Sequence, residues 1–157
     1  MTYKEYKDQA QAEFNALPIF WAFSNDQFME EMKKRSSALT IEEAAKLVYR
    51  FGNGGFYLKT DAQIIHDYME KPDKLHELMK DPEFAEDAFY YEMANHEYHI
   101  NWEADYDVCS CFGHAEYDDN ASGVDYLTAM GYDKETIKAY YNARSRFLHD
   151  ADENGWY

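Results

Sequence analysis

Apolar residues recur at intervals of three and four along most of the chain, which is the period of amphipathic helices. A first helix is predicted from Tyr3 to Leu17, and Pro18 ends it. Two shorter helical segments are predicted at residues 75–79 and 127–130. The remaining helices are predicted to begin at residues that cap helix N-termini, namely Ser24, Thr40, Thr60, Asp81 and Asp133.

Strand patterns lie in the first 60 residues. Ile19 to Phe23 is a short apolar run, and Val48 to Leu58 has β-branched and aromatic residues on both sides of a glycine-rich tip at residues 52–55. Because Gly and Asn tolerate positive φ angles, the second segment predicts a β-hairpin. A phosphate-binding loop is the alternative, but it requires a following Gly-Lys-Ser/Thr that this segment lacks.

These elements predict an α+β fold that is predominantly α-helical, with several short helices packed around a small antiparallel hairpin or three-stranded sheet. The chain has 157 residues, of which 46% are hydrophobic, enough for one sizeable core. No linker-like segment rich in Pro, Gly or Ser interrupts it. We therefore expect a single domain over residues 1–157.

The formal net charge of −16 is unevenly distributed. Residues 1–60 contain 8 acidic and 8 basic residues, whereas residues 61–157 contain 23 acidic and 7 basic residues. Between Lys80 and Lys134, 53 residues include 14 acids, seven tyrosines and no Lys or Arg. Such a charge is repelled by phosphate backbones and anionic membranes, so direct nucleic-acid or membrane binding is not expected. A solvated face is the ordinary explanation, and a surface for a basic protein partner is the functional one.

The helix predicted from Pro82 to about His96 brings several of these acids together. At 100° per residue, Glu83, Glu86 and Asp87 share one face, and Glu97 joins them if the helix extends that far. After Asn101 the sequence predicts irregular loops whose acids lie beside this face. The predicted partner-binding surface consists of Glu83, Glu86, Asp87, Glu97, Glu103, Asp105, Asp107, Glu116, Asp118 and Asp119.

A possible metal motif overlaps this region. Its members are His96, His99, Cys109, Cys111 and His114. Imidazole and thiolate groups are preferred zinc ligands, but the Cys-x-Cys spacing is shorter than in most structural zinc sites. The alternative is that the histidines satisfy the helix end and the cysteines are small core residues. We therefore expect no cofactor and assign no metal ligand and no catalytic residue from the sequence.

The compartment is predicted from the cysteines and from the lack of targeting signals. Two cysteines are too few for a disulfide framework, and the N-terminal residues lack the apolar stretch of a secretory signal. The longest apolar run, residues 16–23, is interrupted by Pro18 and is too short to span a bilayer. We expect the protein in a reducing cytoplasm.

Three segments carry a family resemblance: Trp21–Phe28, the glycine-rich tip with Tyr57 and Lys59, and Ala88–Tyr98. They resemble a family of small acidic proteins from bacteriophages and mobile elements of Gram-positive gut bacteria. Cys109, Cys111 and residues 115–122 lie outside the resemblance. It names no catalytic residue, and it implies a protein that antagonises host defence in the bacterial cytoplasm, as anti-CRISPR and anti-restriction proteins do.

Charge and resemblance together predict a non-enzymatic inhibitor of a nucleic-acid-binding defence enzyme. Its acidic surface would imitate DNA and occupy the basic channel of a nuclease, where carboxylates pair with arginines and tyrosines such as Tyr90, Tyr98 and Tyr106 stack on them. One alternative is a small zinc-stabilised interaction module with His96, His99, Cys109 and Cys111 as ligands. A metal-dependent hydrolase that uses some of the same residues is the other.

Overall fold

The computed structural model describes residues 1–37 and 40–157, and their contacts divide into two compact units. The helical unit comprises residues 1–10 and 73–157, and the sheet unit comprises residues 11–72. The boundary between the units falls within helix α1 (Tyr3–Asn15), with residues 3–10 assigned to the helical unit and residues 11–15 to the sheet unit. That the two units together form one folding domain stays a prediction.

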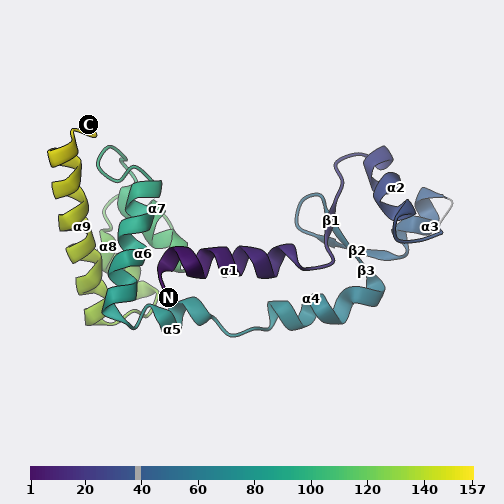
Figure 1. The fold of residues 1–157 in the computed structure, drawn as a ribbon, viewed down its shortest axis with the longest axis horizontal. Helices are drawn as coiled ribbons and strands as arrows, with labels where there is room; N and C mark the ends of the chain where they lie inside the picture. Colours follow the sequence, from purple (N-terminus) through teal and green to yellow (C-terminus); the bar gives the residue numbers. More distant parts are fainter. Residues whose placement is uncertain (38–39) are drawn as a thin grey trace. The chain divides into compact units, whose positions relative to one another are not determined.

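The helical unit is built from helices that begin at the predicted caps. Asp81 and Asp133 accept hydrogen bonds from the backbone N–H groups of Glu83 and Thr136, and Pro82 fills the first position of its helix. The two long helices α6 and α9 lie side by side (Figure 1). The elements are α5 (Lys74–Leu78), α6 (Pro82–Asn95), α7 (Ala104–Cys109), η2 (Ser110–Phe112), α8 (Gly123–Ala129) and α9 (Lys134–Asn154).

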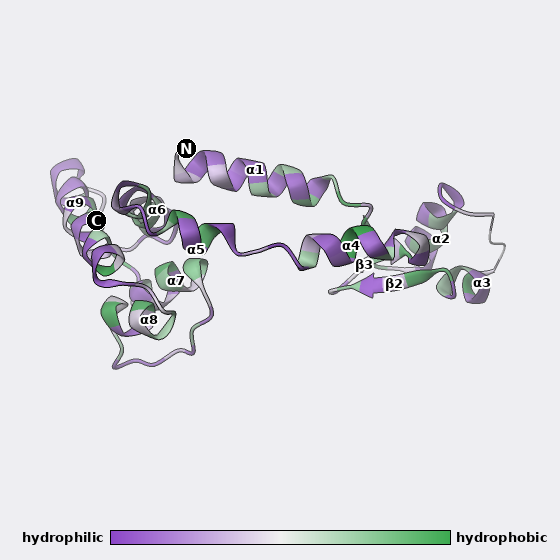
Figure 2. Cartoon of the chain, turned by 90° about the horizontal axis from the view of Figure 1, so that it is seen from below, coloured by the Kyte–Doolittle hydropathy of each residue, from purple (hydrophilic) through white to green (hydrophobic). Residues whose placement is uncertain are grey.

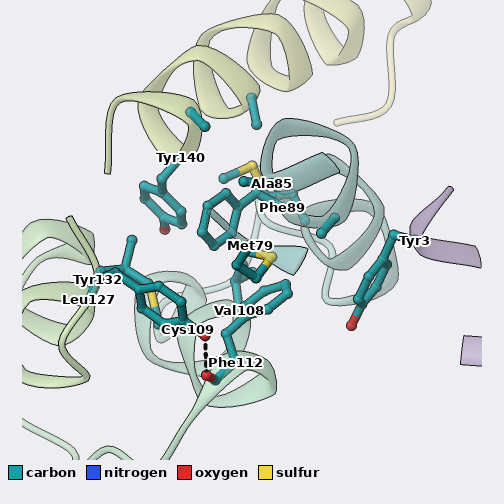
Figure 3. Packing of buried hydrophobic residues seen from close by; sticks show 14 of the residues in the cluster. Tyr3, Met79, Ala85, Phe89, Val108, Cys109, Phe112, Leu127, Tyr132 and Tyr140 are labelled. Atoms are coloured by element: carbon teal, nitrogen blue, oxygen red, sulfur yellow. Dashed lines mark hydrogen bonds between the residues drawn. The ribbon is translucent and has the colours of Figure 1, made fainter. Parts of the chain in front are cut away.

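The core of the helical unit is aromatic. Phe89 on α6 and Tyr140 on α9 are fully buried and meet edge to face, with ring centroids 5.0 Å apart (Figure 3). The Tyr132 hydroxyl donates a hydrogen bond of 2.6 Å to the backbone oxygen of Phe112, which satisfies two polar groups inside this core. Buried aromatic rings thus join α6, α9 and η2.

The sheet unit contains a three-stranded antiparallel sheet in the order β1-β3-β2. The predicted hairpin is confirmed, with Tyr49 opposite Tyr57 and with Gly54 at a φ of +83°, where a Cβ atom would also clash with the ring of Phe23. The elements are β1 (Phe20–Trp21), α2 (Asn25–Lys33), α3 (Ile41–Ala45), β2 (Val48–Phe51), β3 (Gly55–Leu58), η1 (Lys59–Asp61) and α4 (Ala62–Met69).

Two local predictions are wrong. Thr60 does not cap a helix, because Lys59–Asp61 form a 3-10 turn that runs directly into α4 without a side-chain cap. Asp105 and Asp107 do not lie in a loop, because residues 104–109 form α7. The cause is tertiary packing, since α7 is short and buries Ala104, Val108 and Cys109.

The predicted fold class is confirmed as predominantly α-helical with one small antiparallel sheet. In Figure 2, most of α1 and α9 is coloured as hydrophilic, in keeping with helices that turn one side to solvent. Within residues 1–37 and 40–157, no helix has both the length and the apolar character needed to cross a bilayer.

Candidate functional site

An acidic cleft of about 210 Å³ lies in the helical unit, between the segment at residues 101–106 and the segment at residues 117–121. Among the described residues that line the cleft there is no Lys, Arg or His. Its carboxylates belong to Glu103, Asp105, Asp118 and Asp119, and its aromatic rings belong to Tyr98, Trp102, Tyr106, Tyr117 and Tyr126. The cleft therefore gathers four of the ten predicted acidic residues.

The aromatic wall of the cleft is largely held in place by other rings. Tyr106 meets Tyr117 edge to face at 5.4 Å and Tyr126 at 5.8 Å between ring centroids. The Tyr126 hydroxyl donates a 2.8 Å hydrogen bond to the backbone oxygen of Asp118, which ties the loop to α8. Trp102 differs from these rings, because its side chain is completely exposed at the rim.

One of the four carboxylates is already paired within the fold. Asp105 accepts hydrogen bonds from the hydroxyls of Tyr98, at 2.7 Å, and of Tyr140. Burial and this bond to Asp105 raise the pKa of Tyr98 to about 12, and Arg144 donates to the same hydroxyl at 2.9 Å. Asp105 thus positions Tyr98 at the base of the cleft and is not free to bind a partner.

The other three carboxylates are exposed and have no cationic partner within the described residues. The side-chain carboxylates of Asp118 and Asp119 each accept one hydrogen bond, from Asn120, and among the described residues none donates to the carboxylate of Glu103. Partial burial, and after it the carboxylates of Glu103 and Asp119, raise the pKa of Tyr117. Since no Lys or Arg among the described residues pairs with these three carboxylates, the mouth of the cleft has a negative potential.

The three acids of the predicted α6 face have different surroundings. Glu83 is exposed, but Glu86 accepts a hydrogen bond from Arg146 at 2.8 Å, and Asp87 accepts the backbone N–H of Tyr3 at 2.8 Å. The Asp87 carboxylate therefore binds the N-terminus of α1, where a negative charge is favourable.

Glu97 does not continue this face, because the helix does not extend as far as that prediction required. Helix α6 ends at Asn95, and Glu97 has a φ of +50°. The N–H of Tyr98 then bonds to the backbone oxygen of Met93 at 3.0 Å, a helix-ending arrangement that turns Tyr98 into the core.

Asp107 and Glu116 do not line the acidic cleft. Asp107 accepts a hydrogen bond from Asn101 at 2.9 Å, and the Asn101 side chain also accepts the backbone N–H of Glu103. Glu116 is exposed in the loop before α8. Asp107 and Asn101 thus stabilise the turn that carries Glu103 into the cleft.

A second group of polar side chains lies at the C-terminal end of α6. The Nε2 atom of His96 is 3.4 Å from Sγ of Cys111 and 3.5 Å from Oε2 of Glu92. Among the described residues, this is the one group of three or more His, Cys, Asp or Glu side chains whose possible ligand atoms all lie within 4.8 Å of one another. We call these three residues the Glu92 triad.

The buried carboxylate of the triad is held by several donors. Oε1 of Glu92 accepts hydrogen bonds from the Tyr3 hydroxyl at 2.7 Å and from Nζ of Lys7 at 2.9 Å. Burial alone works to raise the pKa of Glu92, but the hydrogen bonds from Lys7, Tyr3 and Asn95 outweigh it, and the pKa is lowered. Burial, and after it the Glu92 carboxylate, raise the pKa of the Cys111 thiol to about 12.

The predicted zinc motif is only partly brought together. His96 and Cys111 meet in the triad, whereas Cys109 is fully buried in the aromatic core and His99 packs against Phe147 and Trp156. His114 is exposed in the loop after η2. Sequence reasoning missed Glu92 as the third member, although its position four residues before His96 on one helix is a signal for such a pair.

No curated protein and no solved structure matches the chain. One family model does match, over residues 2–118. This range includes the Glu92 triad and the segment at residues 101–106 that lines the acidic cleft. The chain therefore belongs to the DUF7659 family, a family of unknown function.

Proposed function

We propose that this protein is a non-enzymatic inhibitor that docks on the basic nucleic-acid-binding surface of another protein, with the acidic cleft as its anchor. The cleft receives an arginine or lysine side chain of the partner. This differs from the DNA-like row of carboxylates expected from the sequence, because Glu86 and Asp87 on α6 already have hydrogen-bond partners within the chain.

One observation carries the proposal: the cleft has three unpaired carboxylates and five aromatic rings, and no base lines it among the described residues. A guanidinium group pairs with carboxylates through its N–H fork and stacks on aromatic faces, so this lining suits Arg better than any neutral ligand. Trp102 lines the cleft with a fully exposed side chain, and Trp is enriched among the residues that contribute most to binding.

The choice of a nucleic-acid-binding partner rests on charge and resemblance. Such partners carry clustered Lys and Arg. The acidic segment at residues 81–133, which contains no Lys or Arg, attracts these side chains. The resemblance to phage and mobile-element proteins favours a host defence nuclease as the target. Inhibition then follows from occupation of the nuclease's basic channel.

The first test measures binding to an arginine-rich peptide as a model of such a surface. The triple variant Glu103→Lys, Asp118→Lys and Asp119→Lys is compared with the triple variant Glu30→Lys, Glu42→Lys and Glu70→Lys in the sheet unit. Both change the net charge equally, and all six side chains are exposed. We expect the cleft variant to lose at least about tenfold in affinity and the sheet-unit variant to bind nearly as the wild type does.

The second test uses a panel of purified restriction and CRISPR nucleases. We expect the protein to inhibit DNA cleavage by a member of the panel, to compete with DNA and to weaken steeply as salt rises. An equal loss of peptide affinity in the two triple variants would assign binding to overall charge and contradict the role of the acidic cleft. Inhibition that leaves DNA occupancy unchanged would contradict the proposed mechanism.

A further inference from the structure

We infer that Glu92, His96 and Cys111 form a binding site for one divalent transition-metal ion, with zinc as the best fit. The inference is independent of the proposed function, because none of the three residues lines the acidic cleft. It also differs from the sequence motif, since it includes Glu92 and leaves out His99, Cys109 and His114.

The distances within the triad match those between zinc ligands. Bonds of about 2.0–2.3 Å in a tetrahedral arrangement place neighbouring N, O and S ligand atoms about 3.3–3.6 Å apart. Nε2 of His96 is 3.4 Å from Sγ of Cys111 and 3.5 Å from Oε2 of Glu92. Two edges of the ligand triangle therefore have the required length before any side chain moves.

The local structure holds these three side chains on helical elements. Glu92 lies in the last turn of α6 with a fully buried side chain, and His96 is the C-terminal cap residue of the same helix. Cys111 lies in η2, and its Sγ atom is 3.4 Å from the backbone oxygen of Asp107 in α7. An ion at the triad would therefore join the end of α6 to η2.

The hydrogen bonds around Glu92 leave the correct oxygen for a metal. The hydroxyl of Tyr3 and the ammonium of Lys7 contact Oε1, whereas Oε2 faces His96 at 3.5 Å and accepts one hydrogen bond, from the side-chain amide of Asn95 at 3.2 Å. A carboxylate oxygen has two lone pairs, so Oε2 keeps one for a metal ion. Ligating carboxylates are commonly oriented by hydrogen bonds of this kind to their other oxygen. Glu92 therefore serves as a one-oxygen ligand, and Tyr3 and Lys7 are positioning residues.

The donor set also indicates the class of metal. One carboxylate, one imidazole and one thiolate suit zinc and its neighbours in the first transition row, and they do not suit Ca²⁺ or Mg²⁺, which prefer oxygen alone. The side chain of His96 is 31% exposed, so solvent reaches the site. Three protein ligands leave the fourth tetrahedral position to water. On binding, the Cys111 thiol releases its proton and becomes a thiolate.

The experiment titrates the full-length, metal-free protein with Zn²⁺ against a chromogenic chelator, and with Co²⁺ in an absorption spectrometer. We expect one equivalent to bind, a thiolate-to-cobalt charge-transfer band, and a higher melting temperature with zinc. Cys111→Ser should abolish the band. His96→Gln and Cys111→Ser should each weaken zinc binding by more than the about 10–100-fold that loss of an outer-shell partner costs.

His99→Gln and His114→Gln are the matched controls, because both belong to the sequence motif and neither to the triad. They should bind zinc as the wild type does. Absence of stoichiometric binding by the wild type would overturn the site, and this result needs no variant to fold. Binding that survives Cys111→Ser, or that depends on His99 or His114, would also overturn the ligand assignment.

Discussion

The helical unit and the sheet unit differ most in where they carry charge. The helical unit contains 22 acidic and 8 basic residues, whereas the sheet unit contains 9 and 7. A chain that needed acidity for solubility alone would have no reason to concentrate it in one unit, because concentrated like charge opposes folding through self-repulsion. The excess of acidic residues therefore belongs to the helical unit and not to the chain as a whole.

The two units also differ in their cores. Of the largest fully buried side chains among the described residues, only Met32 belongs to the sheet unit. The buried members of the sheet unit's core are Phe20, Ala22, Phe28, Met32 and Ala44. The helical unit therefore has the larger core. Tyr98 and Tyr126 of the acidic cleft belong to this core, and Cys111 of the Glu92 triad packs against it.

The concave surfaces of the two units have opposite chemistry. The sheet unit has an open groove of about 520 Å³ lined mainly by apolar side chains, including Phe23, Phe28 and Phe56, with Arg50 as its one charged side chain among the described residues. The acidic cleft of the helical unit has carboxylates and no base. Substitutions in the groove are therefore suitable controls for substitutions in the cleft.

The largest expected effect contrasts the two cores. Phe89→Ala removes a fully buried ring that contacts Phe112 and Tyr140, and it should lower the free energy of unfolding by about 3–5 kcal/mol. Phe28→Ala, at a ring that is 7% exposed in a smaller core, should cost less. Urea denaturation followed by circular dichroism measures both. An equal or larger loss of unfolding free energy in Phe28→Ala would contradict this ranking of the two cores.

The next effect concerns binding rather than stability. Trp102→Ala should weaken binding to the arginine-rich peptide by about 2 kcal/mol, roughly 30-fold, because an exposed ring at a cleft rim acts mainly on a partner. Its unfolding free energy should stay within about 0.5 kcal/mol of wild type. Phe23→Ala in the sheet unit, also at an exposed ring, is the control and should leave peptide binding unchanged.

The sequence predicts the elements of both units far better than it predicts the cleft. Cap signals such as Asp81 followed by Pro82 act within one turn, so they are visible in sequence and are confirmed. The cleft depends on Tyr106 and Tyr117 meeting across two segments, and on α7, which forms because Val108 is buried. Such contacts leave no local pattern.

The acidic face shows the same limit. Helical periodicity predicts that Glu86 and Asp87 share one face of the helix, but it contains no information on which side chains lie opposite them. Arg146 lies 60 residues away along the chain from Glu86, and Tyr3 lies 84 residues away from Asp87. Both acids therefore have partners within the chain, although neither is buried, and sequence alone overestimates the unpaired charge of α6.

A smaller effect is expected from the hydroxyl of Tyr132 in the helical unit. Tyr132→Phe leaves the backbone oxygen of Phe112 without its partner and should cost about 1–2 kcal/mol at neutral pH. Burial raises the pKa of Tyr132 to about 12, so the folded state favours the neutral hydroxyl. The stabilisation of the folded state by the neutral Tyr132 hydroxyl is complete below pH 10, the ordinary pKa of tyrosine, and is lost as pH rises towards 12.

Urea denaturation at pH 8 and pH 11 tests this sign. The wild type should lose more stability between the two values than Tyr132→Phe does, because the variant lacks one of the groups that titrate. An identical loss in both proteins would show that Tyr132 does not contribute to alkaline unfolding. Circular dichroism at pH 8 controls for a change of fold in the variant.

The smallest effect isolates the sheet unit. The Ser24 hydroxyl accepts the backbone N–H of Gln27 at 3.1 Å and caps α2, so Ser24→Ala should cost about 1 kcal/mol and Ser24→Gly only a few tenths. Neither variant changes the charge, and neither touches the acidic cleft, so both should bind the arginine-rich peptide as the wild type does. If Ser24→Ala weakened peptide binding as well as stability, the acidic surface would depend on the sheet unit, and the separation of charge from scaffold would not hold.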